Sequence, residues 1–149
     1  MKLNSMLLAV ALVLVSSCVS LQTPEGYAEM EYAGGHDYKA VSTDAAVVTV
    51  RVHRNQDKKQ GTLDYWTEAS RNQLTLSRGY TFKEEGQFVS TRGPGRWLLF
   101  EQRYKGTLYL YLLGLVVDGR KIFALEATGE KEIFQKDMPK LVKCFSSLR

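Results

Sequence analysis

The sequence predicts an α+β domain, an antiparallel sheet of about six to seven strands with two packed helices, after an N-terminal signal peptide. Three observations support this fold class. Short segments of alternating apolar and polar residues recur along the chain and are separated by glycine-containing turns. A capped amphipathic segment interrupts this series, and an apolar stripe with helical spacing ends the chain. With 149 residues, 44% of them hydrophobic, the chain can build the core of one domain.

The N-terminal segment has the pattern of a secretion signal. Lys2 supplies the positive start, and residues 6–15 form an unbroken apolar run. Ser16 and Ser17 are small residues of the kind that a signal peptidase accepts. The apolar run is shorter than the roughly 20 residues that a membrane-spanning helix needs. We therefore expect residues 1–17 to be removed as a signal peptide.

The end of this segment, Val15-Ser16-Ser17-Cys18, resembles the lipobox of bacterial lipoproteins. The resemblance implies that the Cys18 thiol takes a diacylglycerol, that cleavage falls just before Cys18, and that the new amine is acylated. Such an anchor is stable because each buried CH₂ contributes about 0.8 kcal/mol. Val19 stands where an Asp tends to retain lipoproteins of enteric type in the inner membrane. We therefore expect a lipid anchor in the outer membrane, with the domain on the periplasmic face or at the cell surface.

The segment after the expected anchor is polar and is broken by Pro24 and Gly26. We interpret residues 18–26 as the lipidated cysteine and its tether, followed by a single domain over residues 27–149. Each extended residue spans at most about 3.5 Å, so this tether keeps the domain close to its membrane. Any partner must therefore meet the domain there.

The first half of the domain is predicted to contain three strands and a helix. Alternation of apolar and polar residues predicts strands over residues 27–32, 38–42 and 47–53. A helix is predicted over residues 62–78. Thr62 can cap it, because its side-chain oxygen can accept one of the unpaired backbone N–H groups of the first turn.

The next part of the chain is predicted to be a run of strands. We expect a hairpin around Glu85-Gly86 and a turn at Gly93-Pro94-Gly95. Strands are predicted over residues 80–84, 87–91, 96–104, 107–117 and 120–127. Asp118-Gly119 between two apolar runs is a strong hairpin signal, because tight turns need positive φ angles. Residues 108–113 are apolar on both faces, so we expect them to form a central strand that is covered on each side.

The C-terminal segment, residues 129–149, is predicted to be helical. Its large apolar residues are spaced by four, three, four and three positions, which places them on one stripe: Phe134, Met138, Leu141, Phe145 and Leu148. Pro139 lacks the N–H that a helix interior donates, so we expect it to separate a short first piece from the main helix. Both helices are expected to pack on one face of the sheet.

Element order and a few short strings resemble the PsbP-like superfamily. The strings are a helix that ends at Gly79-Tyr80, the run Leu125-Glu126-Ala127-Thr128-Gly129 before a helix, the ending Cys144-Phe145-Ser146-Ser147-Leu148-Arg149, and Trp97 and Phe100 on a long meander. The superfamily includes the PsbP extrinsic proteins of photosystem II, a Ran-binding nuclear import factor and many small bacterial lipoproteins. The resemblance implies a PsbP-like fold over residues 27–149 and a role in binding proteins or assisting assemblies. It assigns no functional residue.

The sequence lacks the usual patterns of catalysis and of metal or cofactor binding. Neither His36 nor His53 has metal-ligand spacing to another histidine or cysteine. Cys144 is interpreted as a packed small hydrophobe and Glu126 as an outward-facing strand residue. We therefore expect a non-enzymatic protein without a cofactor or metal. The formal charge of +4 is mild and the basic residues are scattered, which argues against a nucleic-acid partner.

Arginine and aromatic residues indicate where a protein partner could bind. They are Arg92, Arg96, Trp97, Arg103 and Tyr104, close in sequence to the Gly-Pro-Gly turn. Residues of these types are enriched at interface hot spots. The leading hypothesis is therefore a lipoprotein that docks another envelope protein, although aromatic residues also pack sheets for structural reasons alone. Two alternatives remain open: a small-ligand or lipid-binding module with a Tyr- and Trp-lined pocket between sheet and helices, and a hydrolase.

Overall fold

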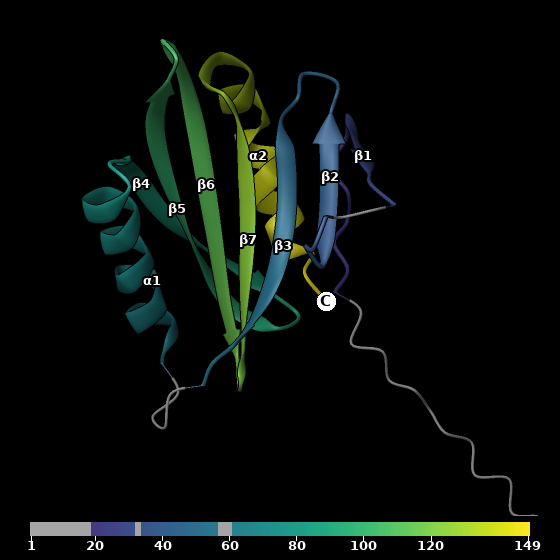
Figure 1. Ribbon diagram of the computed structural model, residues 1–149. Helices are drawn as coiled ribbons and strands as arrows, with labels where there is room; N and C mark the ends of the chain where they lie inside the picture. The colour runs from purple at the N-terminus through teal and green to yellow at the C-terminus, as the bar shows by residue number, and fades with distance from the viewer. Residues whose placement is uncertain (1–18, 32–33, 57–60) are drawn as a thin grey trace, which may run out of the picture.

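The computed structural model describes residues 19–31, 34–56 and 61–149 (Figure 1). Its seven strands are β1 (Tyr27–Glu29), β2 (Tyr38–Ser42), β3 (Val47–Arg54), β4 (Thr81–Ser90), β5 (Gly93–Tyr104), β6 (Thr107–Asp118) and β7 (Lys121–Glu130). The helices are α1 (Leu63–Asn72), which continues into the π-helical turn η1 (Gln73–Ser77), and α2 (Lys131–Ser146). All neighbouring strands are antiparallel, in the order β1-β2-β3-β7-β6-β5-β4. The predicted α+β class is confirmed.

The segment before β1 is held against the domain. The predicted signal peptide and Cys18 lie outside the described residues, whereas residues 19–26, expected to be a tether, lie within them. Ser20 and Arg149 exchange two backbone hydrogen bonds, with N···O distances of 3.4 and 3.1 Å. Val19 packs against the core. The chain therefore leaves the domain at a defined point rather than through a free linker.

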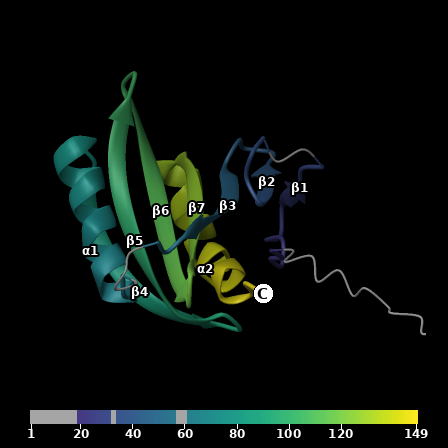
Figure 2. The ribbon, with the colours of Figure 1, turned by 60° about the horizontal axis from the view of Figure 1, so that its bottom comes forward.

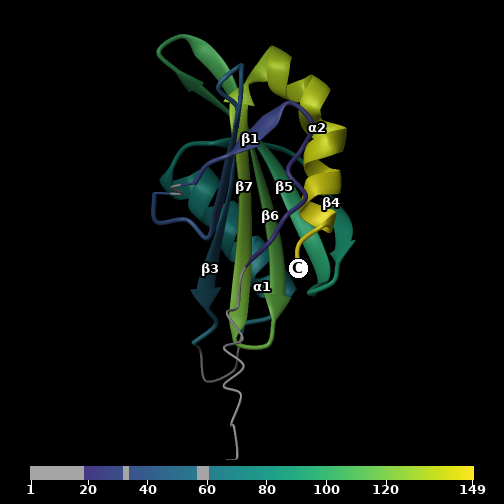
Figure 3. The same ribbon diagram turned by 90° about the vertical axis from the view of Figure 1, so that its right-hand side faces the viewer.

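The two helices cover opposite faces of the sheet (Figures 2 and 3), whereas the sequence predicted both on one face. β5, β6 and β7 bury apolar residues on both sides, so each side needs its own cover. α2 supplies the predicted stripe, with Phe134 and Phe145 packed beside Leu112. Leu74 packs beside Leu98 and other residues of the opposite face. β6 lies next to the middle strand, β7, and is covered on both faces as predicted.

The hairpin predicted around Glu85-Gly86 and the turn predicted at residues 93–95 are both wrong. β4 runs unbroken through Gly86 with a bulge between Phe82 and Glu84, and the turn to β5 is Thr91-Arg92. The glycines have a packing role here. A Cβ on Gly86 would collide with the Trp97 ring, and one on Gly95 would collide with the Phe88 ring. Glycine marks close approach of an aromatic side chain here rather than a turn.

Helix boundaries follow the sequence more closely. The N–H of Tyr65 donates to Thr62 Oγ1 at 3.2 Å, which confirms the predicted cap of α1. α2 continues through Pro139, so the predicted break there is wrong. Proline removes one helical hydrogen bond, to the carbonyl of Gln135. The side chains of Gln135 and Pro139 are both exposed, so water can reach this part of the helix.

Gly114 of β6 provides a test of the packing between α2 and the sheet. A Cβ at this position would lie 2.5 Å from Cδ2 of Phe145. Gly114→Val should therefore lower the free energy of unfolding by about 1–3 kcal/mol, the usual effect of overpacking a core. Urea unfolding measures this change. The control is Gly119→Asn, at a turn position with φ of 56°. A Cβ at Gly119 would have no other atom within 4 Å, so this substitution should change stability far less.

Candidate functional site

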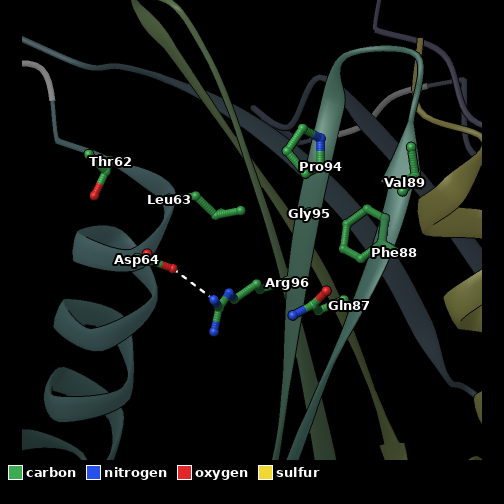
Figure 4. Close-up of a pocket in the computed structure, with 9 residues that line it drawn as sticks. All are labelled: Thr62, Leu63, Asp64, Gln87, Phe88, Val89, Pro94, Gly95 and Arg96. Atoms are coloured by element: carbon green, nitrogen blue, oxygen red, sulfur yellow. Dashed lines mark ion pairs between the residues drawn. The ribbon is translucent and has the colours of Figure 1, made fainter.

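A hollow of about 430 Å³ lies between the first turn of α1 and the β4–β5 hairpin (Figure 4). Leu63 from α1, Phe88 and Val89 from β4, and Pro94 from β5 supply its apolar lining. The Thr62 cap fixes where α1 begins, and the two-residue turn fixes where β5 begins. The site therefore depends on two local signals that are far apart in sequence.

A charged pair and an exposed apolar side chain border this hollow. Arg96 Nη2 lies 2.8 Å from Asp64 Oδ1, and the Asp64 side chain is largely exposed, so the pair contributes little to folding. Val89 is 73% exposed although it lies on a strand. β4 is also an edge strand of the sheet, so one side of its backbone faces no other strand. These features together make a surface that can accept a partner segment.

The other residues predicted to bind a partner do not gather at this hollow. Arg92 occupies the β4–β5 turn, where its Nη1 lies 3.5 Å from Asp118 Oδ2. Arg103 lies near the other end of β5 and donates to the carbonyl of Gly106 at 2.8 Å. Eleven residues of extended chain separate the two arginines by roughly 36 Å. Arg92 and Arg103 therefore lie far apart, on either side of Arg96 along the β5 direction.

The two predicted aromatic residues are also separated. Trp97 packs against the core on the α2 face and covers Gly86. Tyr104 is 59% exposed at the far end of β5, where Lys105 Nζ lies 5.3 Å from its ring centre. Only Arg96 of the predicted set therefore lines the hollow.

A second hollow, a groove of about 440 Å³, runs between α1 with η1 and the sheet. Its floor is apolar and is formed by β6 and β7 residues Leu113, Leu115, Ile122 and Ala124. Trp66 of α1 forms part of its wall. This groove resembles the Tyr- and Trp-lined pocket of the alternative sequence hypothesis. The sequence did not predict which residues form it.

Tyr111 and Glu126 line the same groove. Burial raises the pKa of the Tyr111 hydroxyl above its usual value, and the negative charge of the nearby Glu126 carboxylate raises the pKa further. The two residues are diagonal neighbours, because Tyr111 pairs with Thr128 and Leu113 pairs with Glu126. They therefore place a hydroxyl and a carboxylate beside an apolar floor. Alternation in the sequence predicts only an outward-facing strand residue at Glu126.

Asn55 fixes the position of Trp66, which lines this groove, and no sequence pattern indicates this role. Its side chain is 3% exposed. It donates to the carbonyl of Gly61 at 2.9 Å and accepts from the N–H of Gly61 at 3.0 Å. The Asn55 Oδ1 also accepts from Trp66 Nε1 at 3.2 Å. Asn55 thus joins the end of β3 to the start of α1 and fixes the Trp66 ring.

Metal ligands do not cluster in the described ranges, where no group of three His, Cys, Asp or Glu side chains could hold an ion. His53 borders the groove. Cys144 of α2 is buried in the core, which confirms its interpretation as a packed small hydrophobe. No helix among residues 19–31, 34–56 and 61–149 is long and apolar enough to cross a membrane.

Cys144 gives a pH-dependent prediction. Burial raises the pKa of its thiol to about 12 in the folded chain from 9.0 in the unfolded chain. Below pH 9 both states keep the proton, so the stability does not change with this group. Above pH 9 only the unfolded chain loses it, so the free energy of unfolding should fall by roughly 1.4 kcal/mol per pH unit.

Urea unfolding of the wild type and Cys144→Ala between pH 8 and pH 10.5 measures this slope. The buried tyrosines are present in both proteins, so they cancel in the difference between the slopes. Equal slopes would contradict a buried, protonated thiol.

No family model matches the sequence, and no curated protein matches it. Solved structures do match. Cyanobacterial PsbP from Synechocystis sp. PCC 6803 is 10% identical with a TM-score of 0.62, covering 89% of this chain and 86% of that one. LpqN from Mycobacterium tuberculosis, involved in cell envelope biogenesis, is 10% identical with a TM-score of 0.63, covering 87% and 82%. A Pseudomonas aeruginosa protein of unknown function is 9% identical with a TM-score of 0.53, covering 86% and 84%. The domain therefore has the PsbP-like fold that the sequence resemblance predicted.

Proposed function

We propose that the chain is a lipid-anchored, non-enzymatic accessory protein of the cell envelope that docks another envelope protein at the hollow beside α1. The observation that carries this proposal is the exposed Val89 on an edge strand, next to an apolar hollow with Arg96 at its rim. The fold shared with LpqN, a protein of cell envelope biogenesis, supports an envelope role. The lipobox-like residues that end at Cys18 support the anchor, and Val19 after the cysteine supports the outer-membrane location.

The edge of β4 is protected along only half of its length. Lys83, Glu84 and Glu85 carry charges on the first half, and Glu85 forms an ion pair with Arg71 of α1. Charged residues on an edge strand discourage pairing with other chains. The second half, residues 87–90, carries no charge and lies beside the hollow. The open half of the edge is therefore the part that can accept a strand.

An extended segment of the partner fits these features best. Its backbone would pair with residues 87–90 of β4, as in other cases of strand addition. One of its apolar side chains would fill the hollow beside Leu63 and Pro94. An acidic side chain of the partner would compete with Asp64 for the Arg96 guanidinium. Backbone pairing supplies affinity in this mode, and the hollow and Arg96 supply specificity.

Val89→Lys tests this docking mode. The side chain is exposed, so the substitution should change folding stability by less than about 0.5 kcal/mol. It should abolish capture of the partner when the lipidated protein is crosslinked in intact cells and purified in detergent. Arg96→Glu should weaken the capture as well, because it removes the charge offered to the partner.

Two matched controls define the surface. Leu76→Lys places the same charge on an equally apolar and 82% exposed residue of η1, away from the hollow. Arg103→Glu reverses a charge near the other end of β5. Both variants should capture the partner as the wild type does. Undiminished capture by Val89→Lys would exclude this docking surface.

A second candidate function is the binding of a small amphipathic molecule in the groove under α1. The groove, at about 440 Å³, has the size of the pockets that small ligands occupy. Tyr111 and Glu126 favour ligand binding because they place two polar groups beside its apolar floor. A ligand hydroxyl or amine would donate to the Glu126 carboxylate, and the apolar body would cover Leu113 and Ala124.

Native mass spectrometry of the purified protein tests ligand binding. A bound molecule should appear in the wild type and should be lost or weakened at least tenfold in Glu126→Gln, since hydrogen bonds to charged groups are worth about 1.5–3 kcal/mol. Glu130→Gln is the control on the same strand, because Glu130 does not line the groove. Wild-type spectra without an adduct would refute this candidate.

A further inference from the structure

The described chain begins at one end of the sheet, beside a small basic pocket. In Figure 1, the start of the described chain and the C-terminus lie toward the lower end of the sheet. The β4–β5 and β6–β7 turns lie toward the same end. Val19 lines a pocket of about 220 Å³ together with Arg54, Arg92, Lys121 and Phe123. We call this region the anchor end. The hydrogen bonds between Ser20 and Arg149 keep the start of the chain there.

The basic residues of the anchor end are only partly compensated: Asp118 lies opposite Lys121 in the β6–β7 ladder, but it pairs with Arg92. Arg54 and Lys121 are directly opposite each other in the β3–β7 ladder. Like charges in this position repel and weaken a sheet. Within the described ranges, neither of them forms an ion pair, and neither does the exposed Arg120 beside them. The fold therefore keeps an unfavourable arrangement that an outside anion would relieve.

Arg92 adds a third cation to the pocket wall. Its guanidinium lies over the Phe123 ring at 5.2 Å from the ring centre, and its Nη1 is 3.5 Å from Asp118. Its Nε is buried without a hydrogen-bond partner. The second acid at this end, Asp37, already accepts the N–H of Val52 at 2.7 Å and also lines the pocket. Among the residues that the structure describes at this end, cations thus outnumber acids, and one guanidinium donor has no acceptor.

We propose that the anchor end lies on an anionic phospholipid surface, with lipid phosphate bound among Arg54, Arg92 and Lys121. The proposal rests on the lipid anchor at Cys18 that belongs to the proposed function. Val19 is bonded directly to Cys18, so acyl chains on that cysteine would begin next to these cations. Basic groups this close to a bilayer lie within the Debye length of about 8 Å and attract anionic headgroups.

The arrangement sets the orientation of the domain on its membrane. The β5–β6 turn at residues 105–106 lies at the opposite end of twelve-residue strands, about 40 Å away. That turn would point away from the bilayer. A flexible tether alone would give no preferred orientation, so the basic pocket and the fixed start of the chain act together.

Hydrogen exchange of the lipidated protein on vesicles tests the proposal. The protein is purified from membranes in detergent, and its intact mass first establishes whether Cys18 carries acyl chains. It is then placed in vesicles of phosphatidylcholine alone or of phosphatidylcholine with 30% phosphatidylglycerol. Amides of the turns at residues 91–92 and 118–121 should exchange at least fivefold more slowly on the anionic vesicles. Amides at residues 105–106 should exchange equally on both.

Neutral variants separate charge from folding. Arg54→Gln with Lys121→Gln should remove most of this protection, since each basic side chain near an anionic surface contributes roughly a fivefold preference. The variant should fold at least as stably as the wild type, because it removes a repulsive pair. Lys121→Glu, which replaces a cation of the pocket with an anion, should also reduce the protection on anionic vesicles.

Lys105→Gln with Lys136→Gln is the control, because it removes two charges away from the anchor end and should retain the protection. Equal exchange on both vesicle types, or protection at residues 105–106 instead, would overturn the proposed orientation. A mass without acyl chains would overturn the anchor on which it rests. Loss of partner capture by Val89→Lys with unchanged vesicle protection would separate docking from membrane orientation.

Discussion

Both faces of the strands β5, β6 and β7 are apolar, and this constraint determines the rest of the architecture. A sheet with two apolar faces is stable in water only when both faces are covered. α2 covers one face and contacts β4, β6 and β7, whereas α1 covers the other face mainly over β5 and β6. The shorter cover leaves Ile122 and Ala124 of β7 at the floor of an open groove. The groove is therefore a direct result of how little of this face α1 covers.

The same constraint explains which parts of the fold were predictable from the sequence. The alternation of apolar and polar residues predicted nearly all of the strands, and the apolar stripe predicted α2. Both patterns depend only on residue spacing within one element. The hairpin at Glu85-Gly86 was wrong because a glycine that accepts the Trp97 ring looks like a turn glycine when only one strand is considered. The placement of both helices on one face was wrong although residues 108–113 already indicated two covered faces.

Site residues were harder to predict because they depend on register. Arg92, Arg96 and Arg103 are close in sequence, but an extended strand moves them about 3.3 Å apart per residue and alternates their faces. Tyr111 and Glu126 are distant in sequence, yet the β6–β7 register makes them diagonal neighbours. The hairpin signal at Asp118-Gly119 came close to this information. A two-residue turn there would place Tyr111 directly opposite Glu126, whereas the turn is Gly119-Arg120 and makes the two residues diagonal neighbours. Asn55 had no such signal, because its partners come from two separate segments, the start of α1 and the β6–β7 turn.

The proposed docking surface and the proposed anchor end share one end of the sheet. Val89 and Pro94 flank the same β4–β5 turn that carries Arg92, so the hollow lies close to where the chain would enter the membrane. A partner at this hollow would therefore be met near the bilayer surface, which favours a membrane-bound envelope protein over a soluble one. The groove under α1 extends from Arg54 toward Tyr111, away from that end. Partner docking and ligand binding thus use separate surfaces, so they can be tested independently in one protein.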